Sequence, residues 1–441
     1  MKHSMKRPGF KLLCVAAAFM LSACTKPSNE TGINFPVPTP PAKEQEPEVD
    51  NGKLKIGTKE DSCEGGRVPY FVCLSSDSSW KMSGKPGWIS AVKSEGGAGG
   101  KQIVPLILSK NTSGSPRDAE LVFKSESGCT VKLKLTQQPY TAPSVSTLDD
   151  KTFIVCCNSH IYFGGVVKHT GARQNDSGML FQMAKQYGAK NCNVIDCSYA
   201  GHRLRDFTEA GCTETSKEPA TCSGKGFDLL SGIDLKAVDY VIIAQDGSNR
   251  SEFYSEATAI YDRFAAVNPH VQPMIINYCY TVFKKHKYVL NGMKDLYSNY
   301  GTIVVNAGEL INDICTGGAK LPNSSITNWG QYTFINHKGT NDDTGDIHHP
   351  NPLSGYIYTQ MVVNALTGAA PLDQAGHTAL LNNNSVRFAA GSDKYTISTY
   401  KGLFYTTPDD DVDFDAVLAD KATMDDIKSL MPIYINRCPS Y

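Results

Sequence analysis

The chain has 441 residues, of which 41% are hydrophobic, with 43 lysines and arginines against 44 aspartates and glutamates. This length and apolar content can supply the cores of two or three domains. A net charge of −1 argues against nucleic acid as a partner, because phosphate binding normally leaves a basic excess. No transmembrane helix is predicted after residue 24, because no run of about 18 consecutive apolar side chains follows it.

The N-terminus has the pattern of an export signal. Basic residues at 2–11 precede an apolar run at 12–20, and small residues then lead to Cys24. The sequence Leu-Ser-Ala-Cys at 21–24 resembles the lipobox of bacterial lipoproteins, in which the cysteine is diacylated and becomes the first residue of the mature chain. The resemblance implies a signal peptide at 1–23 and an exported protein held at Cys24 on a bacterial membrane, expected to be the outer one, in the periplasm or at the cell surface.

Residues 24–51 are expected to form a flexible tether, because six prolines lie between Thr25 and Asp50, together with Glu44, Glu46 and Glu48. Lipid at Cys24 would then be the protein's contact with the membrane.

Twelve cysteines remain once Cys14 and Cys24 are set aside, and an even number in an exported chain predicts disulfides. Three pairs are close enough in sequence to close local loops, although spacing does not fix connectivity: Cys63/Cys73, Cys192/Cys197 and Cys212/Cys222. A zinc site is not expected, because the chain has no C-x-x-C pair and no cysteine pair followed by matching histidines. No metal or other cofactor is predicted.

Short alternating apolar runs at 68–72, 102–108, 119–123 and 130–135 predict an all-β module over 52–140. Its Trp80, Trp88, Asn111 and Arg117, with the glutamines at 137–138, resemble the BACON domains, which are immunoglobulin-like modules of exported glycan-degrading proteins. The resemblance implies either carbohydrate binding or a spacer. The two tryptophans are expected in the core rather than on a sugar platform.

The period changes after the linker at 142–149. Buried-looking runs at 153–155, 193–195, 240–243, 274–276 and 302–305 alternate with helical patterns at 179–187, 252–267, 295–300 and 353–366. This alternation predicts an α/β fold over 150–441, in which helices cover both faces of a parallel sheet. Catalytic residues of such a sheet are expected in loops at the carboxyl ends of its strands.

A serine and a late Asp–His pair follow that rule. Ser159 comes directly after the first predicted strand, and Asp346 and His349 precede a predicted helix. A hydroxyl nucleophile needs a base to remove its proton and a carboxylate to orient that base. The offset of three residues between Asp346 and His349 lets one turn carry both groups.

These blocks resemble the SGNH or GDSL hydrolases, especially an exported branch whose first block reads Gly-Asn-Ser. The resemblance spans about 151–368 and implies a flavodoxin-like three-layer sandwich with Ser159 as nucleophile, Asp346 as orienting carboxylate and His349 as base. It implies oxyanion donors at Gly201 and at either Asn249 or Gln245, because the register of the third block is uncertain by a residue or two. The expected activity is that of a serine esterase that deacylates carbohydrate O-esters.

One residue departs from the family pattern, because Cys157 stands where the family has glycine. A Cβ there would cost about 1 kcal/mol or more if the turn requires positive φ. A noncatalytic surface glycan-binding protein with a degenerate SGNH domain is therefore kept as the alternative. A lipid esterase or thioesterase is a second one, disfavoured because no apolar lid segment is visible. His348 is expected to be an ordinary loop residue, and the aspartates at 409–415 a solvated loop before a last helix.

Overall fold

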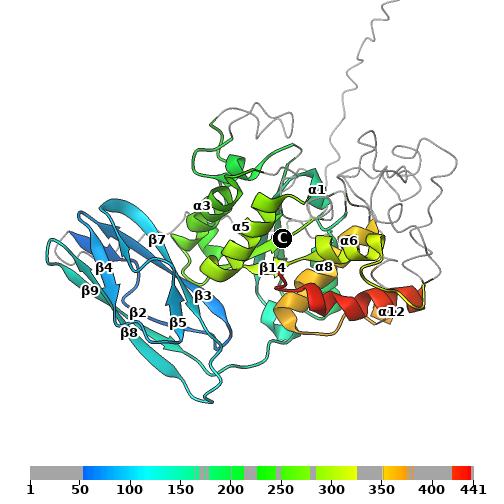
Figure 1. Ribbon diagram of the computed structural model, residues 1–441, viewed down its shortest axis with the longest axis horizontal. Coiled ribbons are helices and arrows are strands. Elements are labelled where there is room, and N and C mark those ends of the chain that lie inside the picture. Colours follow the sequence, from blue (N-terminus) through cyan, green and yellow to red (C-terminus); the bar gives the residue numbers. More distant parts are fainter. Residues whose placement is uncertain are drawn as a thin grey trace, which may run out of the picture. The chain divides into compact units, whose positions relative to one another are not determined.

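The switch in hydrophobic period separates an all-β domain from an α/β domain in the computed structural model (Figure 1). Among the residues that it describes, no helix is both long and apolar enough to span a membrane. The predicted tether and Cys24 lie outside these residues. The structure describes residues 53–162, 164–167, 174, 178–199, 201–212, 226–244, 250–278, 285–324, 350, 352–373, 375–376, 380 and 420–438.

Two sheets make up the all-β domain, with strand orders β1-β3-β7-β5 and β2-β9-β8-β4-β6. All their pairings are antiparallel except β2 with β9. The strands are β1 (Leu54–Ile56), β2 (Glu60–Cys63), β3 (Val68–Ser76), β4 (Trp80–Ser83), β5 (Ile89–Ala91), β6 (Glu95–Gly96), β7 (Gly99–Leu108), β8 (Arg117–Ser125) and β9 (Thr130–Gln137).

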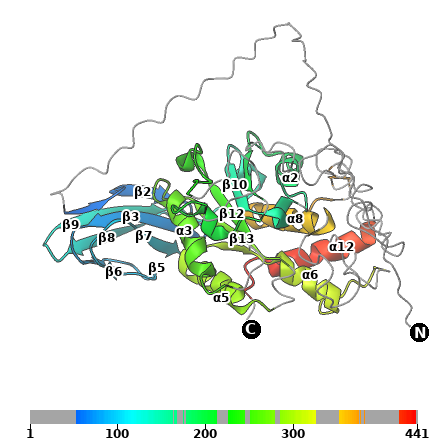
Figure 2. The same cartoon turned by 90° about the horizontal axis from the view of Figure 1, so that it is seen from above.

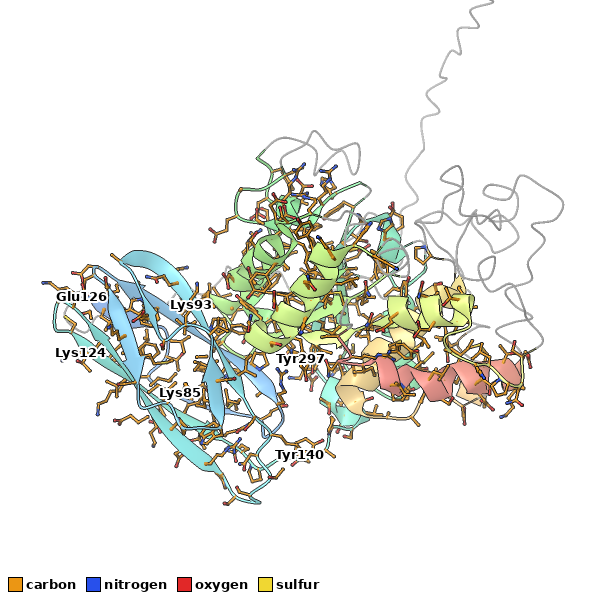
Figure 3. The ribbon with its side chains drawn as sticks, in the orientation of Figure 1. Lys85, Lys93, Lys124, Glu126, Tyr140 and Tyr297 are labelled. Carbon is orange, nitrogen blue, oxygen red and sulfur yellow. The ribbon has the colours of Figure 1, made fainter. Side chains whose placement is uncertain are left out.

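The apolar face of each long strand fills the space between the two sheets. In β9, Val131, Leu133 and Leu135 are buried while the alternate residues are exposed or half-buried, as a period of two requires. Trp80 is only 2% exposed and packs against Phe123, with ring centroids 5.9 Å apart. Trp80 is therefore a core residue, as expected. Figure 3 labels Lys124 and Glu126, both exposed at the far end of β8.

The residues on which the BACON resemblance rests contact one another or nearby backbone through hydrogen bonds and a cation–π contact. Asn111 is 1% exposed, and its Nδ2 lies 2.8–3.2 Å from the backbone carbonyls of Ser115 and of residues 137 and 138. The Nε of Arg117 donates to Gln137 Oε1 at 2.9 Å, and its guanidinium lies over the Trp88 ring at 4.3 Å. These contacts tie β8 and β9 to the connection after β7. The pattern of Asn, Arg, Gln and Trp thus stabilises the module's own fold.

Five parallel strands form the sheet of the α/β domain, in the order β11-β10-β12-β13-β14. Renumbered along the chain, this order is 2-1-3-4-5, the flavodoxin-like arrangement. All five predicted strand positions are confirmed. The strands are β10 (Thr152–Cys157), β11 (Asn193–Ser198), β12 (Tyr240–Ala244), β13 (Gln272–Ile276) and β14 (Ile303–Val305).

Helices cover both faces of this sheet, as continuous apolar strands require. One face packs against α2 (Met179–Gln186), α6 (Ala307–Thr316), α8 (Pro352–Thr367) and α12 (Lys421–Leu430). The other packs against α3 (Phe253–Ala265) and α5 (Lys287–Asp295). Figure 2 displays the two groups on either side of the strands. The chain thus has the three layers expected of the fold.

The predicted helix at 295–300 is wrong in its bounds. The α-helix α5 already begins at Lys287, and a π-helical segment, η5 (Leu296–Tyr300), continues it until Gly301 reverses the chain with φ of 70°. The C-terminal residues extend the sheet edge, since Ile435 bridges Val305 in antiparallel register. The acidic run at 409–415 lies outside the described residues, and the last helix expected after it is α12.

Two of the cysteine pairs that lie close in sequence do not form disulfides. Cys63, which faces the core of the sandwich, and Cys73, on β3 of the other sheet, form no disulfide. Cys192 and Cys197 lie on opposite faces of the parallel sheet, in different core clusters. Five extended residues span roughly 16 Å, whereas bridged Cα atoms are about 4.4–6.8 Å apart. Cys222 lies outside the described residues.

The sandwich contacts the amino-terminal edge of the parallel sheet. Phe71 of β3 is 1% exposed, belongs to the core cluster of α3 and α5, and lies 5.3 Å from the Tyr300 ring. Its N–H donates to the carbonyl of Pro269, just before β13. Arg67 lies over the ring of Tyr297, which Figure 3 labels, at 4.2 Å. The contacting residues of the α/β domain thus precede β13 and β14.

Candidate active site

Ser159 lies where the fold predicts a nucleophile. Strand β10 ends at Cys157, and Ser159 begins the single-turn helix α1 (Ser159–Tyr162) at the carboxyl edge of the sheet. Its side chain is half-buried, whereas the three residues that follow it are buried. A strand-to-helix turn of this kind presents a hydroxyl beside the ends of the neighbouring strands, β11 and β12.

Asn158 joins the loop after β10 to the loop after β11. Its side chain is 6% exposed, and Nδ2 donates to the backbone carbonyl of His202 at 3.0 Å. Its Oδ1 accepts from the N–H of His160 at 3.1 Å. Because both ends of the amide are used, Asn158 is fixed in place. It holds the backbone on both sides of Ser159 against the neighbouring loop.

Gly201 lies in that neighbouring loop, three residues after β11. The end of β11 pairs with the end of β10, Cys157 being opposite Ser198, so Ser159 and Gly201 share one edge of the sheet. Gly201 is exposed and has φ of 72°, a conformation that favours glycine, although a Cβ would meet no atom within 4 Å. The glycine is thus required by the backbone and not by space.

The condition for a penalty at Cys157, a positive φ, is not met. Cys157 is the last residue of β10, pairs in register with Ser198, and is absent from the described non-glycine residues with positive φ. Its side chain is 3% exposed, and Sγ lies 2.8 Å from Tyr278 Oη. The position is extended strand and does not require glycine. A cysteine there fills the core beneath the serine instead of distorting its turn.

Four of the predicted site residues lie outside the described residues, namely Asp346, His349, Gln245 and Asn249, as does His348. The chain that follows the last predicted block is described from Pro350. Pro350 is buried, and its Cγ lies 3.4 Å from the position that a Cβ on Gly164 would take. Gly355, in the first turns of α8, approaches Gly164 so closely that its Cα is 2.9 Å from that same position.

This close approach joins two segments that are far apart in the sequence. Gly164 follows Ser159 by five residues, and Pro350 follows His349 directly. The loop after Ser159 and the chain at Pro350 and Gly355 therefore converge, with Gly164 and Gly355 permitting backbone contact. The structure brings Ser159, Asn158 and Gly201 to one edge and places Pro350 next to the same loop.

His202, Asp206 and Cys212 gather beside this edge, although the sequence predicts no common site for them and pairs Cys212 only with Cys222 as a possible disulfide. The spacing of four residues between the histidine and the aspartate was the only available signal, and it is common in helices.

No protein-family model matches the chain, and no curated protein matches it. Solved structures resemble parts of it. An active-site mutant of a family two carbohydrate esterase from Clostridium thermocellum is 9% identical, with 69% of this chain and 89% of that chain covered and a TM-score of 0.29. A Bacteroides ovatus GH5 xyloglucanase is 12% identical, with 85% and 99% covered and a TM-score of 0.20. The BIgI domain of the beta protein from S. agalactiae is 16% identical, with 20% and 97% covered and a TM-score of 0.16. At these identities and TM-scores, none of the three supports a conclusion about the function of this chain.

Proposed function

We propose that the α/β domain is a serine esterase of the SGNH type. The observation that carries the proposal is the position of Ser159, at a strand-to-helix turn on the carboxyl edge of a 2-1-3-4-5 sheet, with Gly201 in the adjacent loop. Pro350 beside Gly164 supports a late block close enough to supply the base. These features are the requirements for a hydroxyl nucleophile with a separate histidine.

In the proposed reaction, Ser159 Oγ attacks the ester carbonyl while His349 accepts its proton and Asp346 fixes the imidazole tautomer. The alcohol leaves with that proton, and water then hydrolyses the acyl-enzyme by the same route. The N–H groups of Ser159 and Gly201, with Asn249 or Gln245, would stabilise the tetrahedral oxyanion, and each donor is typically worth about 3 kcal/mol.

The proposed substrates are O-acylated carbohydrates. This class is inferred from the sequence resemblances of both domains. The sandwich contacts the amino-terminal edge of the sheet, opposite Ser159, and its Trp80 and Trp88 are engaged in internal contacts. Both observations favour a spacer role for the sandwich over a role in positioning substrate. Selection among esters would then depend on the loops around Ser159.

A fluorophosphonate probe tests the proposal directly, because it reacts covalently only with an activated serine hydroxyl. We expect the intact protein to be labelled on the peptide that contains Ser159, and Ser159→Ala to abolish the labelling. Ser255→Ala, which removes a hydroxyl on the exposed surface of α3, is the matched control and should leave it unchanged. An unlabelled Ser159 in folded protein would favour a noncatalytic glycan-binding role.

We further propose that lipid at Cys24 anchors the protein, on the evidence of the lipobox-like sequence and the proline-rich segment after it. Replacing Cys24 with alanine should move the protein from the membrane fraction to the soluble fraction. Esterase activity should be unchanged, because the α/β domain begins more than a hundred residues later. Retention of the variant in the membrane fraction would reject the anchor and leave the esterase proposal intact.

A further inference from the structure

Three side chains that commonly bind metals meet in the loop after β11. His202, Asp206 and Cys212 are 3%, 1% and 1% exposed, and one ligand atom from each lies within 4.8 Å of the others. Nitrogen, oxygen and sulfur donors are thus gathered in a site shielded from bulk water.

The backbone fixes the three residues independently of any ligand. Asp206 lies in a 3₁₀ turn, η2 (Leu204–Phe207), where its Oδ2 accepts from the N–H of Arg203 at 2.9 Å. Cys212 is paired through its backbone, since its N–H donates to Phe227 and its carbonyl accepts from Gly226, each at 2.7 Å. The carbonyl of His202 accepts from Asn158. The site is therefore preorganised, which lowers the entropic cost of binding an ion.

The contacts do not form a proton relay. A Cys–His–Asp relay uses both ring nitrogens, one for the thiol and one for the carboxylate. Here the same atom, His202 Nδ1, lies 3.3 Å from Asp206 Oδ2 and 3.7 Å from Cys212 Sγ. The other nitrogen, Nε2, is buried without a hydrogen-bond partner among the described residues. A single ring nitrogen cannot donate its proton to the carboxylate and also accept one from the thiol. The three atoms are instead arranged as potential metal ligands that point toward one another.

The spacings match those around a tetrahedral zinc ion. Ligands at about 2.0–2.3 Å from zinc, at tetrahedral angles, are roughly 3.3–3.7 Å from one another. The two separations from His202 Nδ1, 3.3 and 3.7 Å, fall within this range. We propose that His202 Nδ1, the Asp206 carboxylate and the Cys212 thiolate bind a zinc-class divalent ion, with a fourth donor completing the tetrahedron.

The donor set selects the class of ion. A thiolate and an imidazole favour zinc over magnesium or calcium, which prefer oxygen ligands. Burial of all three ligands indicates a structural site. Through the Asn158 hydrogen bond to the His202 carbonyl, the ion would stiffen the loop against which the Ser159 turn is held. Sequence patterns for structural zinc sites require a pair of cysteines, so they do not detect a site that contains a single cysteine.

Metal analysis of the full-length protein tests the proposal. We expect protein produced in zinc-supplemented medium to carry about one zinc per chain by inductively coupled plasma mass spectrometry, and cobalt replacement to give thiolate-to-cobalt charge-transfer absorption. Wild-type protein that is folded, lacks bound zinc and gives no such absorption would overturn the proposal.

Single substitutions assign the ligands. Cys212→Ala should abolish the charge-transfer absorption, and Asp206→Asn should weaken zinc binding on the order of 100-fold in a chelator competition. Cys192→Ala is the matched control, because this buried thiol lies on the other face of the sheet and should leave both readouts unchanged. Charge-transfer absorption that survives in Cys212→Ala would assign the thiolate ligand elsewhere and refute the site. Circular dichroism of each variant separates loss of metal from loss of fold.

Discussion

The two edges of the parallel sheet differ in what their side chains do. At the amino edge, Phe71, Tyr261 and Tyr300 pack in a continuous aromatic contact between the sandwich and the α/β domain. At the carboxyl edge, Asn158 is buried in hydrogen bonds, Gly201 turns with positive φ, and Ser159 is half-buried. The amino edge thus consists of packed apolar side chains, whereas the carboxyl edge consists of hydrogen-bonded polar groups and a constrained backbone.

The difference indicates that the amino edge contributes mainly to stability and the carboxyl edge mainly to the proposed reaction. Apolar contacts add stability roughly in proportion to buried area and tolerate small shifts, whereas catalytic groups need fixed geometry. A change at the amino edge should therefore alter stability and spare the reaction. A change at the carboxyl edge should impair the reaction, whether or not it also lowers stability.

The largest expected effect is at the nucleophile and its base. Ser159→Ala and His349→Ala should each lower kcat for an acetyl ester by a factor on the order of 10³ or more, and the double variant should lose little further, because triad members act as a unit. Asp346→Ala should cost less, since the imidazole retains its proton-accepting nitrogen and loses orientation. Steady-state kinetics on a chromogenic acetyl ester measures all four.

His348→Ala is the internal control for these variants, because only His349 has the offset of three residues from Asp346. If His348→Ala abolished turnover and His349→Ala spared it, the assignment of the block would be off by one residue. Full activity in Ser159→Ala would exclude the serine mechanism altogether.

The next effect is expected at the amino edge. Phe71→Ala should lower the free energy of unfolding by about 3–5 kcal/mol, because the ring is 1% exposed and leaves a cavity against Tyr300. Urea unfolding followed by circular dichroism measures the loss, while kcat at 25 °C should stay within about twofold of the wild-type value. Lys124→Ala, at an exposed position, should change stability by less than about 0.5 kcal/mol. A large loss of kcat in folded Phe71→Ala would mean that the two edges are coupled.

Gly355→Ala sharpens the comparison at the carboxyl edge. Its Cβ would overlap the carbonyl oxygen of Gly164, so α8 would have to move away from the Ser159 loop. We expect a loss of about 1–3 kcal/mol in stability and a fall in kcat of roughly 100-fold, because small displacements of catalytic groups are costly. Gly87→Ala, where a Cβ meets no atom, is the control. Unchanged kinetics in Gly355→Ala would place the base on a segment that does not depend on α8.

The last prediction concerns the pH dependence of stability at the amino edge. Burial raises the pKa of Asp262 to about 7 from an ordinary 3.8, with Lys93 lowering it and Glu209 raising it; the carboxylate also accepts a hydrogen bond from Tyr300. Between these two pH values the native state binds more protons than the unfolded state, so the free energy of unfolding falls as pH rises from about 4 to 7. Asp262→Asn should remove that contribution and flatten the profile relative to wild type in urea titrations. Parallel profiles for the two proteins would contradict the assignment.

Much of the fold follows from local pattern. The five parallel strands and the four longest strands of the sandwich were predicted because their apolar runs are continuous or alternate with a period of two. Short strands such as β1 and β6 were missed, since two or three residues carry no detectable period. Helix α5 was missed at its start, and the bounds near 295–300 were wrong, because a π-helical segment breaks the 3.6-residue repeat.

The candidate site likewise has features that could be predicted from local sequence and features that could not. Ser159 was placed correctly after a strand because a strand end can be read from sequence. The condition for a penalty at Cys157 is not met, since whether a residue ends a strand or begins a turn depends on register with β11. Cys192 and Cys197 form no disulfide because residues an odd number of positions apart on an extended segment face opposite sides.

The sequence by itself determined the order of the longer elements, the change from β-sandwich to parallel sheet, and the position of Ser159 directly after a strand. These properties depend on periodicity within a few residues of each other. Only the tertiary structure decided which edge the sandwich covers, that Gly164 and Gly355 touch, and that His202, Asp206 and Cys212 converge on one point. These three features depend on the order of the strands and on the register in which they pair. Residues that are far apart in the sequence leave no local pattern that reveals such pairing.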